Sequence, residues 1–161
     1  MSTFPAAHHI EAFALRLRRL QPFAIRYAQI ALGVTFLSAV ADRFGLLGRY
    51  GGWGNFANFT AYTAKVLAFL PASTIPFFAW AATIGEIVFG LALILYGVLP
   101  ARIVRASAWP RYVALGSSIL LLLFAISMAI SLGLKKPLDY SVFSASAGAL
   151  LLAVFPDRTC E

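Results

Sequence analysis

The chain has 161 residues, of which 61% are hydrophobic and only 12% are charged, and its mean hydropathy is +0.84. This composition excludes a water-soluble globule with a mostly polar surface and predicts an integral membrane protein. The net charge of +7 does not indicate a nucleic-acid-binding domain, because the basic residues flank apolar segments and form no basic domain of their own.

Residues 1–22 are predicted to be a cytoplasmic leader containing a basic amphipathic helix. Its apolar residues recur at helical spacing, and its arginines fall on other faces; the apolar set is Ile10, Phe13, Ala14, Leu17 and Leu20, and the basic set is Arg16, Arg18 and Arg19. Such a helix is typical of a segment that lies on anionic lipid. Pro22 follows at a position where a new helix can begin.

Four apolar segments are predicted to cross a bilayer, over about 23–42, 76–99, 112–133 and 138–155. A spanning helix needs roughly 20 residues at 1.5 Å per residue. The fourth segment is short, so we expect its helix to start at residues 137–139, where Pro suits the first turn. The connections after the second and third segments are short, so the sequence predicts an all-α, transmembrane four-helix bundle in one domain, 23–155, with a tail at 156–161.

The basic residues predict the orientation. Eight of them fall on the side of the two termini, and the opposite side has a lower density because it includes the longest loop; the eight are Arg16, Arg18, Arg19, Arg26, Arg102, Arg105, Arg111 and Arg158. The positive-inside rule therefore places both termini in the cytoplasm.

The long connection between the first two spans is predicted to contain an outer interfacial helix at about 55–70. Its apolar residues share one broad face, formed by Phe56, Phe59, Thr63, Val66, Leu67 and Leu70, and Pro71 ends it. We expect this amphipathic helix to lie on the outer membrane surface and cover the end of the bundle.

Glu86 is the most informative residue, because it is the only charged side chain in the second predicted span. An acid near the membrane midplane costs at least ~2.5 kcal/mol and by default marks a functional site. Polar residues near the outer ends of the first two spans are candidates to line a ligand-binding cavity with it: Thr35, Ser38, Asp42, Arg43 and Thr83. The alternative is that the small and polar residues are helix-contact residues and that Glu86 is a structural clip between helices.

The sequence offers few groups that could hold a cofactor. Cys160 is the only cysteine, and His8 and His9 are the only histidines. We therefore expect no metal site, no iron–sulfur cluster, no covalently bound cofactor and no nucleophile paired with a base.

Two segments resemble the DoxX-like family of small four-helix membrane proteins. ALGVTFLSAVADRFG (31–45) is similar to the family's first helix with its LGxxF core, and GEIVFGLALILYG (85–97) to its second helix, where a glutamate is followed by a glycine. Many members carry a lysine soon after the first helix, where this chain has Asp42 and Arg43. The resemblance, which covers about 27–155, implies a bacterial inner-membrane protein, and some relatives are subunits of quinone-linked oxidoreductases.

Two functions follow as hypotheses. The first is an accessory membrane subunit that binds a quinone or another amphiphile, with electrons supplied by a partner protein because the chain has no redox centre of its own. The second is a structural or assembly subunit of a larger membrane complex, or a self-associating protein, without ligand chemistry. A transporter would need a second intramembrane charge or broken helices in related positions, and neither is evident.

Overall fold

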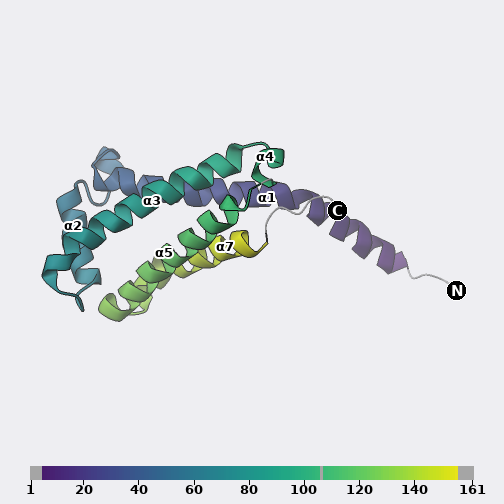
Figure 1. Cartoon of the computed structure of the whole chain (residues 1–161). Helices are drawn as coiled ribbons and strands as arrows, with labels where there is room; N and C mark the ends of the chain where they lie inside the picture. Colours follow the sequence, from purple (N-terminus) through teal and green to yellow (C-terminus); the bar gives the residue numbers. More distant parts are fainter. Residues whose placement is uncertain (1–4, 106, 156–161) are drawn as a thin grey trace.

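The computed structural model describes residues 5–105 and 107–155, and every regular element in them is helical. In chain order these are α1 Pro5–Arg43, η1 Gly48–Tyr50, α2 Phe56–Val66, η2 Ala72–Thr74, α3 Ile75–Val98, α4 Ala101–Arg105, α5 Trp109–Leu132, α6 Lys135–Asp139 and α7 Val142–Val154 (Figure 1). The all-α class is thus confirmed for the described residues. The predicted tail at 156–161, and Cys160 with it, lies outside them.

Within the described residues, three helical segments are long and apolar enough to cross a membrane: Leu15–Arg43, Ala72–Val98 and Trp109–Leu132. The fourth, α7, has 13 residues and so extends about 20 Å. The expected helix over 138–155 is wrong in its first turn, because α6 ends at Asp139 and Ser141 has a left-handed backbone with φ 55°. A residue in that conformation cannot continue a right-handed helix, so the chain turns before α7 begins.

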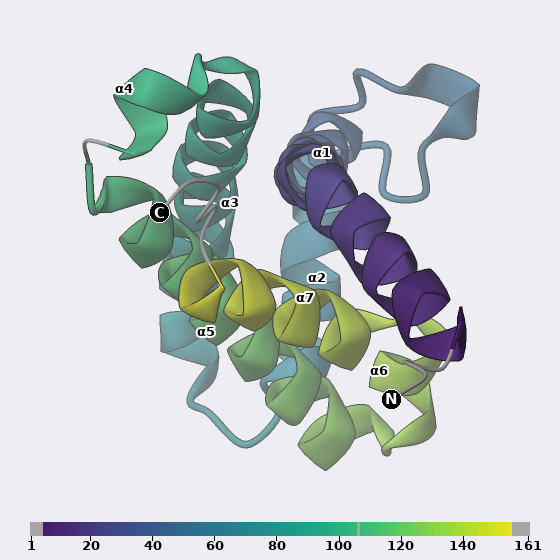
Figure 2. The same cartoon turned by 90° about the vertical axis from the view of Figure 1, so that its right-hand side faces the viewer.

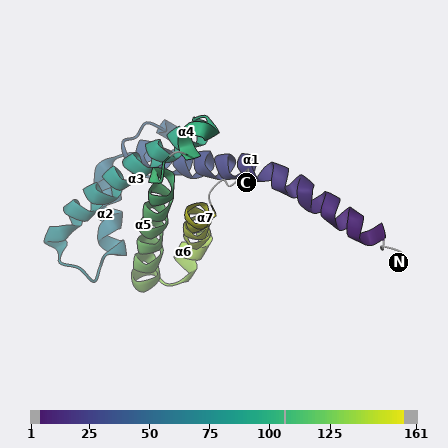
Figure 3. The same ribbon diagram turned by 45° about the vertical axis from the view of Figure 1, so that its right-hand side comes forward.

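α1 runs through Pro22 without ending, which corrects the expectation that a new helix begins there. The proline has no N–H for the carbonyl group of Arg18, four residues earlier, and this missing bond is a known cause of helix bending. Figures 1 and 3 show α1 changing direction along its length, with its N-terminal part turned away from the other helices. The predicted leader and first span are therefore two parts of one bent helix.

The helices pack mainly in two pairs, α1 with α3 and α5 with α7, and α3 also contacts α5 (Figure 2). Glycines allow the first pair to approach closely. A Cβ atom on Gly33 would lie 2.6 Å from Ile94 Cγ1 and 2.7 Å from the carbonyl oxygen of Gly90, and one on Gly97 would lie 2.6 Å from Ile30 Cγ1. Small residues at such positions let helix backbones come into contact in membrane proteins.

Two buried serines join α5 to α7. The Ser118 hydroxyl donates to the carbonyl oxygen of Ser146 at 2.9 Å, and the Ser146 hydroxyl donates to the carbonyl oxygen of Ser118 at 3.0 Å. This reciprocal pair satisfies both hydroxyl groups inside an apolar contact, where an unpaired one would be destabilising. It fixes the register of the short α7 against the longer α5.

α2 lies across one end of the molecule and contacts α1, α3 and α5, as Figure 1 shows at the beginning of α3. The Asn55 side chain caps α2 by accepting from the Asn58 N–H at 2.8 Å. Phe59 and Thr63 are the buried residues of α2. The predicted helix at 55–70 is thus present but ends at Val66, and its apolar face covers the end of the helix pairs.

The close contact of α1 with α3 is tested by replacing Gly33 with Ala. The added methyl group meets backbone atoms of α3 that cannot move aside alone, so we expect Gly33→Ala to lower the free energy of unfolding by about 1–3 kcal/mol. Gly148→Ala is the matched control, because no neighbouring atom of the residues that the structure describes lies within 4 Å of the position its Cβ would take. Unfolding in mixed detergent micelles measures both, and equal effects would contradict the packing described.

Candidate functional site

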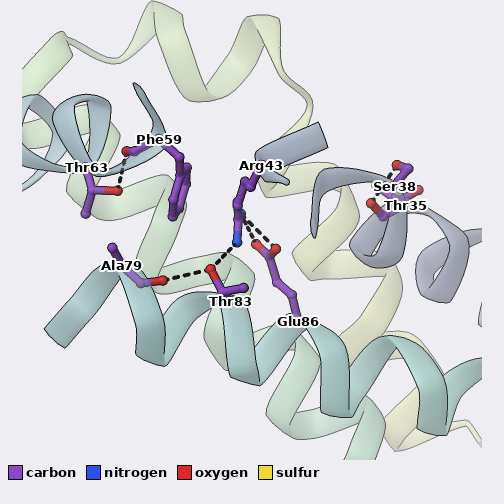
Figure 4. Close-up of polar contacts among 8 residues, drawn as sticks. All are labelled: Thr35, Ser38, Arg43, Phe59, Thr63, Ala79, Thr83 and Glu86. Carbon is purple, nitrogen blue, oxygen red and sulfur yellow. Dashed lines mark hydrogen bonds and ion pairs between the residues drawn. The ribbon is translucent and has the colours of Figure 1, made fainter. Parts of the chain in front are cut away.

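Glu86 on α3 forms a buried ion pair with Arg43, the last residue of α1 (Figure 4). Arg43 Nη2 donates to Glu86 Oε1 at 2.8 Å and lies 2.7 Å from Oε2. The two side chains are only 6% and 4% exposed. The guanidinium group also sits where the partial negative charge of the α1 carboxyl end favours a cation. The lone acid of the second predicted span thus has a named partner.

Thr83 extends this contact by one turn of α3. Arg43 Nη1 donates to the Thr83 hydroxyl oxygen at 3.0 Å, and that hydroxyl donates to the carbonyl oxygen of Ala79 at 2.8 Å. Thr83 is fully buried, and it lies three residues before Glu86, so both side chains project from the same face of α3. Arg43 therefore reaches two acceptors on one helix.

Phe59 of α2 covers the guanidinium group, with its ring centroid 3.7 Å from Arg43 Cζ. A cation at this distance over an aromatic face is attracted by the ring's quadrupole, by about 2 kcal/mol when the pair is desolvated. The sequence placed Phe59 on the inner face of α2 but did not assign it to the site. No sequence signal links the two residues, because Phe59 and Arg43 are separated along the chain, belong to different helices and share no motif.

The pair leaves some hydrogen-bonding capacity unused. Among the described residues, the buried Arg43 Nε has no hydrogen-bond partner. Glu86 Oε2 also accepts no hydrogen bond, but it lies 2.7 Å from Arg43 Nη2 and is held by the ion pair. Buried polar atoms are usually bonded, so the N–H group without an acceptor calls for an explanation. It is a donor that a small group with a carbonyl or hydroxyl oxygen can use.

Asp42 has a different role from its neighbour. Its carboxylate accepts from the Gly52 N–H at 2.9 Å and from the Trp53 N–H at 3.2 Å, which folds the glycine-rich loop back onto the end of α1. A Cβ atom on Gly51 would collide with the same carboxylate, so a larger residue there would displace the Asp42 side chain from these two N–H groups. Asp42 thus holds the segment that leads into α2.

Thr35 and Ser38 are not brought to the ion pair. Both are exposed on α1, and each hydroxyl donates to its own helix, Thr35 to the carbonyl oxygen of Ala31 and Ser38 to that of Thr35 (Figure 4). Of the six residues predicted from sequence, the structure therefore joins Arg43, Thr83 and Glu86 in one network and adds Phe59. Among the described residues there is no group of three or more metal-ligating side chains.

Comparisons with models of known protein families, with curated proteins and with solved structures found no match to this chain. The DoxX-like resemblance is therefore carried by the two quoted segments alone.

Replacing Thr83 with Val tests the polar network without changing side-chain shape. The variant leaves an Arg43 N–H without an acceptor in a buried site, so we expect the free energy of unfolding to fall by about 1–3 kcal/mol. Thr35→Val makes the same chemical change on an exposed face of α1 and should change stability by no more than about 0.5 kcal/mol. Unfolding of both variants in the same micelles measures the difference, and a Thr83→Val protein as stable as Thr35→Val would refute the network.

Proposed function

We propose that the protein is a bacterial inner-membrane protein of the DoxX-like kind, in which α1, α3, α5 and α7 cross the bilayer as a four-helix bundle and both termini are cytoplasmic. Three apolar helices of sufficient length and the unequal distribution of basic residues support this arrangement. The outward faces of these helices carry large apolar side chains, as expected of surfaces that contact lipid.

α7 is short for a helix that crosses the bilayer. A helix of about 20 Å is shorter than a hydrocarbon core of ~30 Å. A short span is accommodated by local thinning of the bilayer and by flanking residues that reach the interface. α6, with its exposed Lys135 and Asp139 joined at 2.7 Å, supplies charged groups at one end of α7.

The topology is tested at Cys160. A membrane-impermeant maleimide should leave this single cysteine unlabelled in intact cells and should label it once the inner membrane is permeabilised, because the tail is cytoplasmic. The matched control is Lys136→Cys in a Cys160→Ser background, which should react in cells whose outer barrier alone is opened. Labelling of Cys160 before permeabilisation would reverse the proposed orientation.

The function that the site supports best is binding of a quinone or a similar amphiphile at the Arg43–Glu86 pair. The observation that carries this proposal is the buried donor Arg43 Nε, which has no acceptor among the described residues and belongs to the guanidinium group paired with Glu86. A quinone carbonyl oxygen would accept from the N–H, a hydroquinone hydroxyl would donate to the carboxylate, and Phe59 provides an aromatic face beside them. Because α2 covers the pair, entry of a ligand requires α2 to move aside.

The chemistry of a bound quinone would be two-electron redox chemistry, and the chain's own residues would bind and orient it. The electrons would come from a partner protein, which makes this chain an accessory subunit of a membrane redox system. Apolar helix faces next to the site would contact the isoprenoid tail of such a ligand.

Titration of the purified protein with a ubiquinone analogue tests the ligand proposal. Replacing Glu86 with Gln changes the acceptor and removes the charge that holds Arg43, so we expect affinity to fall at least about tenfold. Asp139→Asn also replaces a carboxylate with an amide, but at an exposed position, and should leave the affinity for the ubiquinone analogue unchanged. Equal affinity of the Glu86→Gln and wild-type proteins, with both folded, would count against quinone binding.

A second candidate function is a structural or assembly subunit without ligand chemistry. It is favoured by the fact that the same four side chains tie α1, α2 and α3 together in a closed contact. Purification in mild detergent separates the two candidates: a protein partner in stoichiometric amount without a quinone favours assembly, and a co-purifying quinone that the Glu86→Gln variant loses favours binding.

A further inference from the structure

The N-terminal part of α1 extends beyond the end of α3, the helix against which the rest of α1 packs. The end of α3 lies beside Arg26, since a Cβ atom on Gly97 would be 3.4 Å from the Arg26 carbonyl oxygen. Residues before Arg26 therefore have no length of α3 beside them. Figures 1 and 3 show this part of α1 projecting away from the other helices.

This projecting segment exposes large apolar side chains and arginines together. Phe13, Leu17 and Leu20 lie on one face of the helix at helical spacing, and each is more than half exposed. Arg18 and Arg19 lie on the opposite side and are also exposed. An exposed helix with this division is suited to the boundary between lipid headgroups and acyl chains.

Three more arginines stand at the same end of the molecule. Arg26 belongs to α1, Arg102 lies in α4 directly after α3, and Arg111 lies in the first turn of α5. Figure 1 shows α4 and the start of α5 at the level of the middle of α1 along the length of the molecule, and Figure 2 shows them on the other side of α3 from α1. The chain has no acidic residue between positions 12 and 41 or between 87 and 138, so no carboxylate within these segments neutralises the arginines.

We propose that this arginine surface, formed by Arg16, Arg18, Arg19 and Arg26 on α1, binds anionic phospholipid headgroups while Phe13, Leu17 and Leu20 insert among the acyl chains. Arg102 and Arg111 lie at the same end of the molecule on the other side of α3 and add to its positive charge. The inference rests on the membrane location proposed above. Each arginine near an anionic membrane surface adds a similar amount of favourable binding free energy. Several arginines together therefore favour phosphatidylglycerol, which is anionic, over phosphatidylcholine, which is zwitterionic. The surface is thus a selective lipid site in addition to an orientation signal.

The test titrates the full-length protein in neutral detergent with phosphatidylglycerol and, separately, with phosphatidylcholine, followed by native mass spectrometry. The R16Q/R18Q/R19Q variant should bind phosphatidylglycerol on the order of 100-fold more weakly than wild type at low salt, with phosphatidylcholine binding unchanged. The R49Q/K65Q/K136Q variant removes the same charge from exposed residues at the opposite end and should bind like wild type. High salt should reduce the preference of the wild-type protein for phosphatidylglycerol over phosphatidylcholine, because it screens the arginine charges.

An equal loss of phosphatidylglycerol affinity in both triple variants would show that binding follows the net charge of the protein and not a particular site, and would overturn the proposal. Tighter binding of a soluble single-stranded oligonucleotide than of phosphatidylglycerol would also overturn it, in favour of a nucleic-acid surface. Phosphatidylcholine binding without any preference for phosphatidylglycerol would sink this inference alone, whereas the Cys160 labelling decides the membrane orientation independently.

Discussion

The arrangement of α1, α2 and α3 depends on one buried ion pair, between Arg43 and Glu86. A charge in an apolar interior is destabilising unless an opposite charge and further hydrogen bonds compensate it. Here the acid on α3 is compensated only if the end of α1 lies next to it at 2.7–2.8 Å. The pair therefore fixes how far α1 slides along α3, and Phe59 then fixes where α2 crosses them.

The glycines and the ion pair are complementary constraints on the same contact. Gly33, Gly90 and Gly97 let the two backbones approach, which brings a long Arg43 side chain within reach of Glu86. Close packing of small residues lets two helices approach but leaves open how far one slides along the other. The ion pair supplies the direction and the register that the glycines alone leave open.

The long apolar helices could be predicted from the sequence, whereas two helix boundaries could not. Apolar length predicted α3 and α5 well, because hydropathy reports directly on a lipid or core environment. The break at Ser141 was missed, because no glycine or proline marks a left-handed residue there. Continuity through Pro22 was missed as well, since one proline can either begin a helix or bend it.

The candidate site was predicted in part for a similar reason. The charges and Thr83 could be found, because an acid in an apolar segment demands a partner and few cations were near. Thr35 and Ser38 were grouped with them by helical spacing alone, which cannot distinguish a face that packs against a neighbouring helix from an exposed one. Phe59, and the Ser118–Ser146 contact, depend on which helices become neighbours, and one sequence does not contain that information.

The most direct test of the account is a double-mutant cycle on Arg43 and Glu86. Arg43→Met and Glu86→Leu, measured singly and together by unfolding in mixed micelles, give the coupling energy of the pair. We expect each single change to lower the free energy of unfolding by about 3–5 kcal/mol and the double variant to lose far less than their sum, because no charge is left buried alone. Additive losses would show that the two side chains do not interact, and would contradict the account.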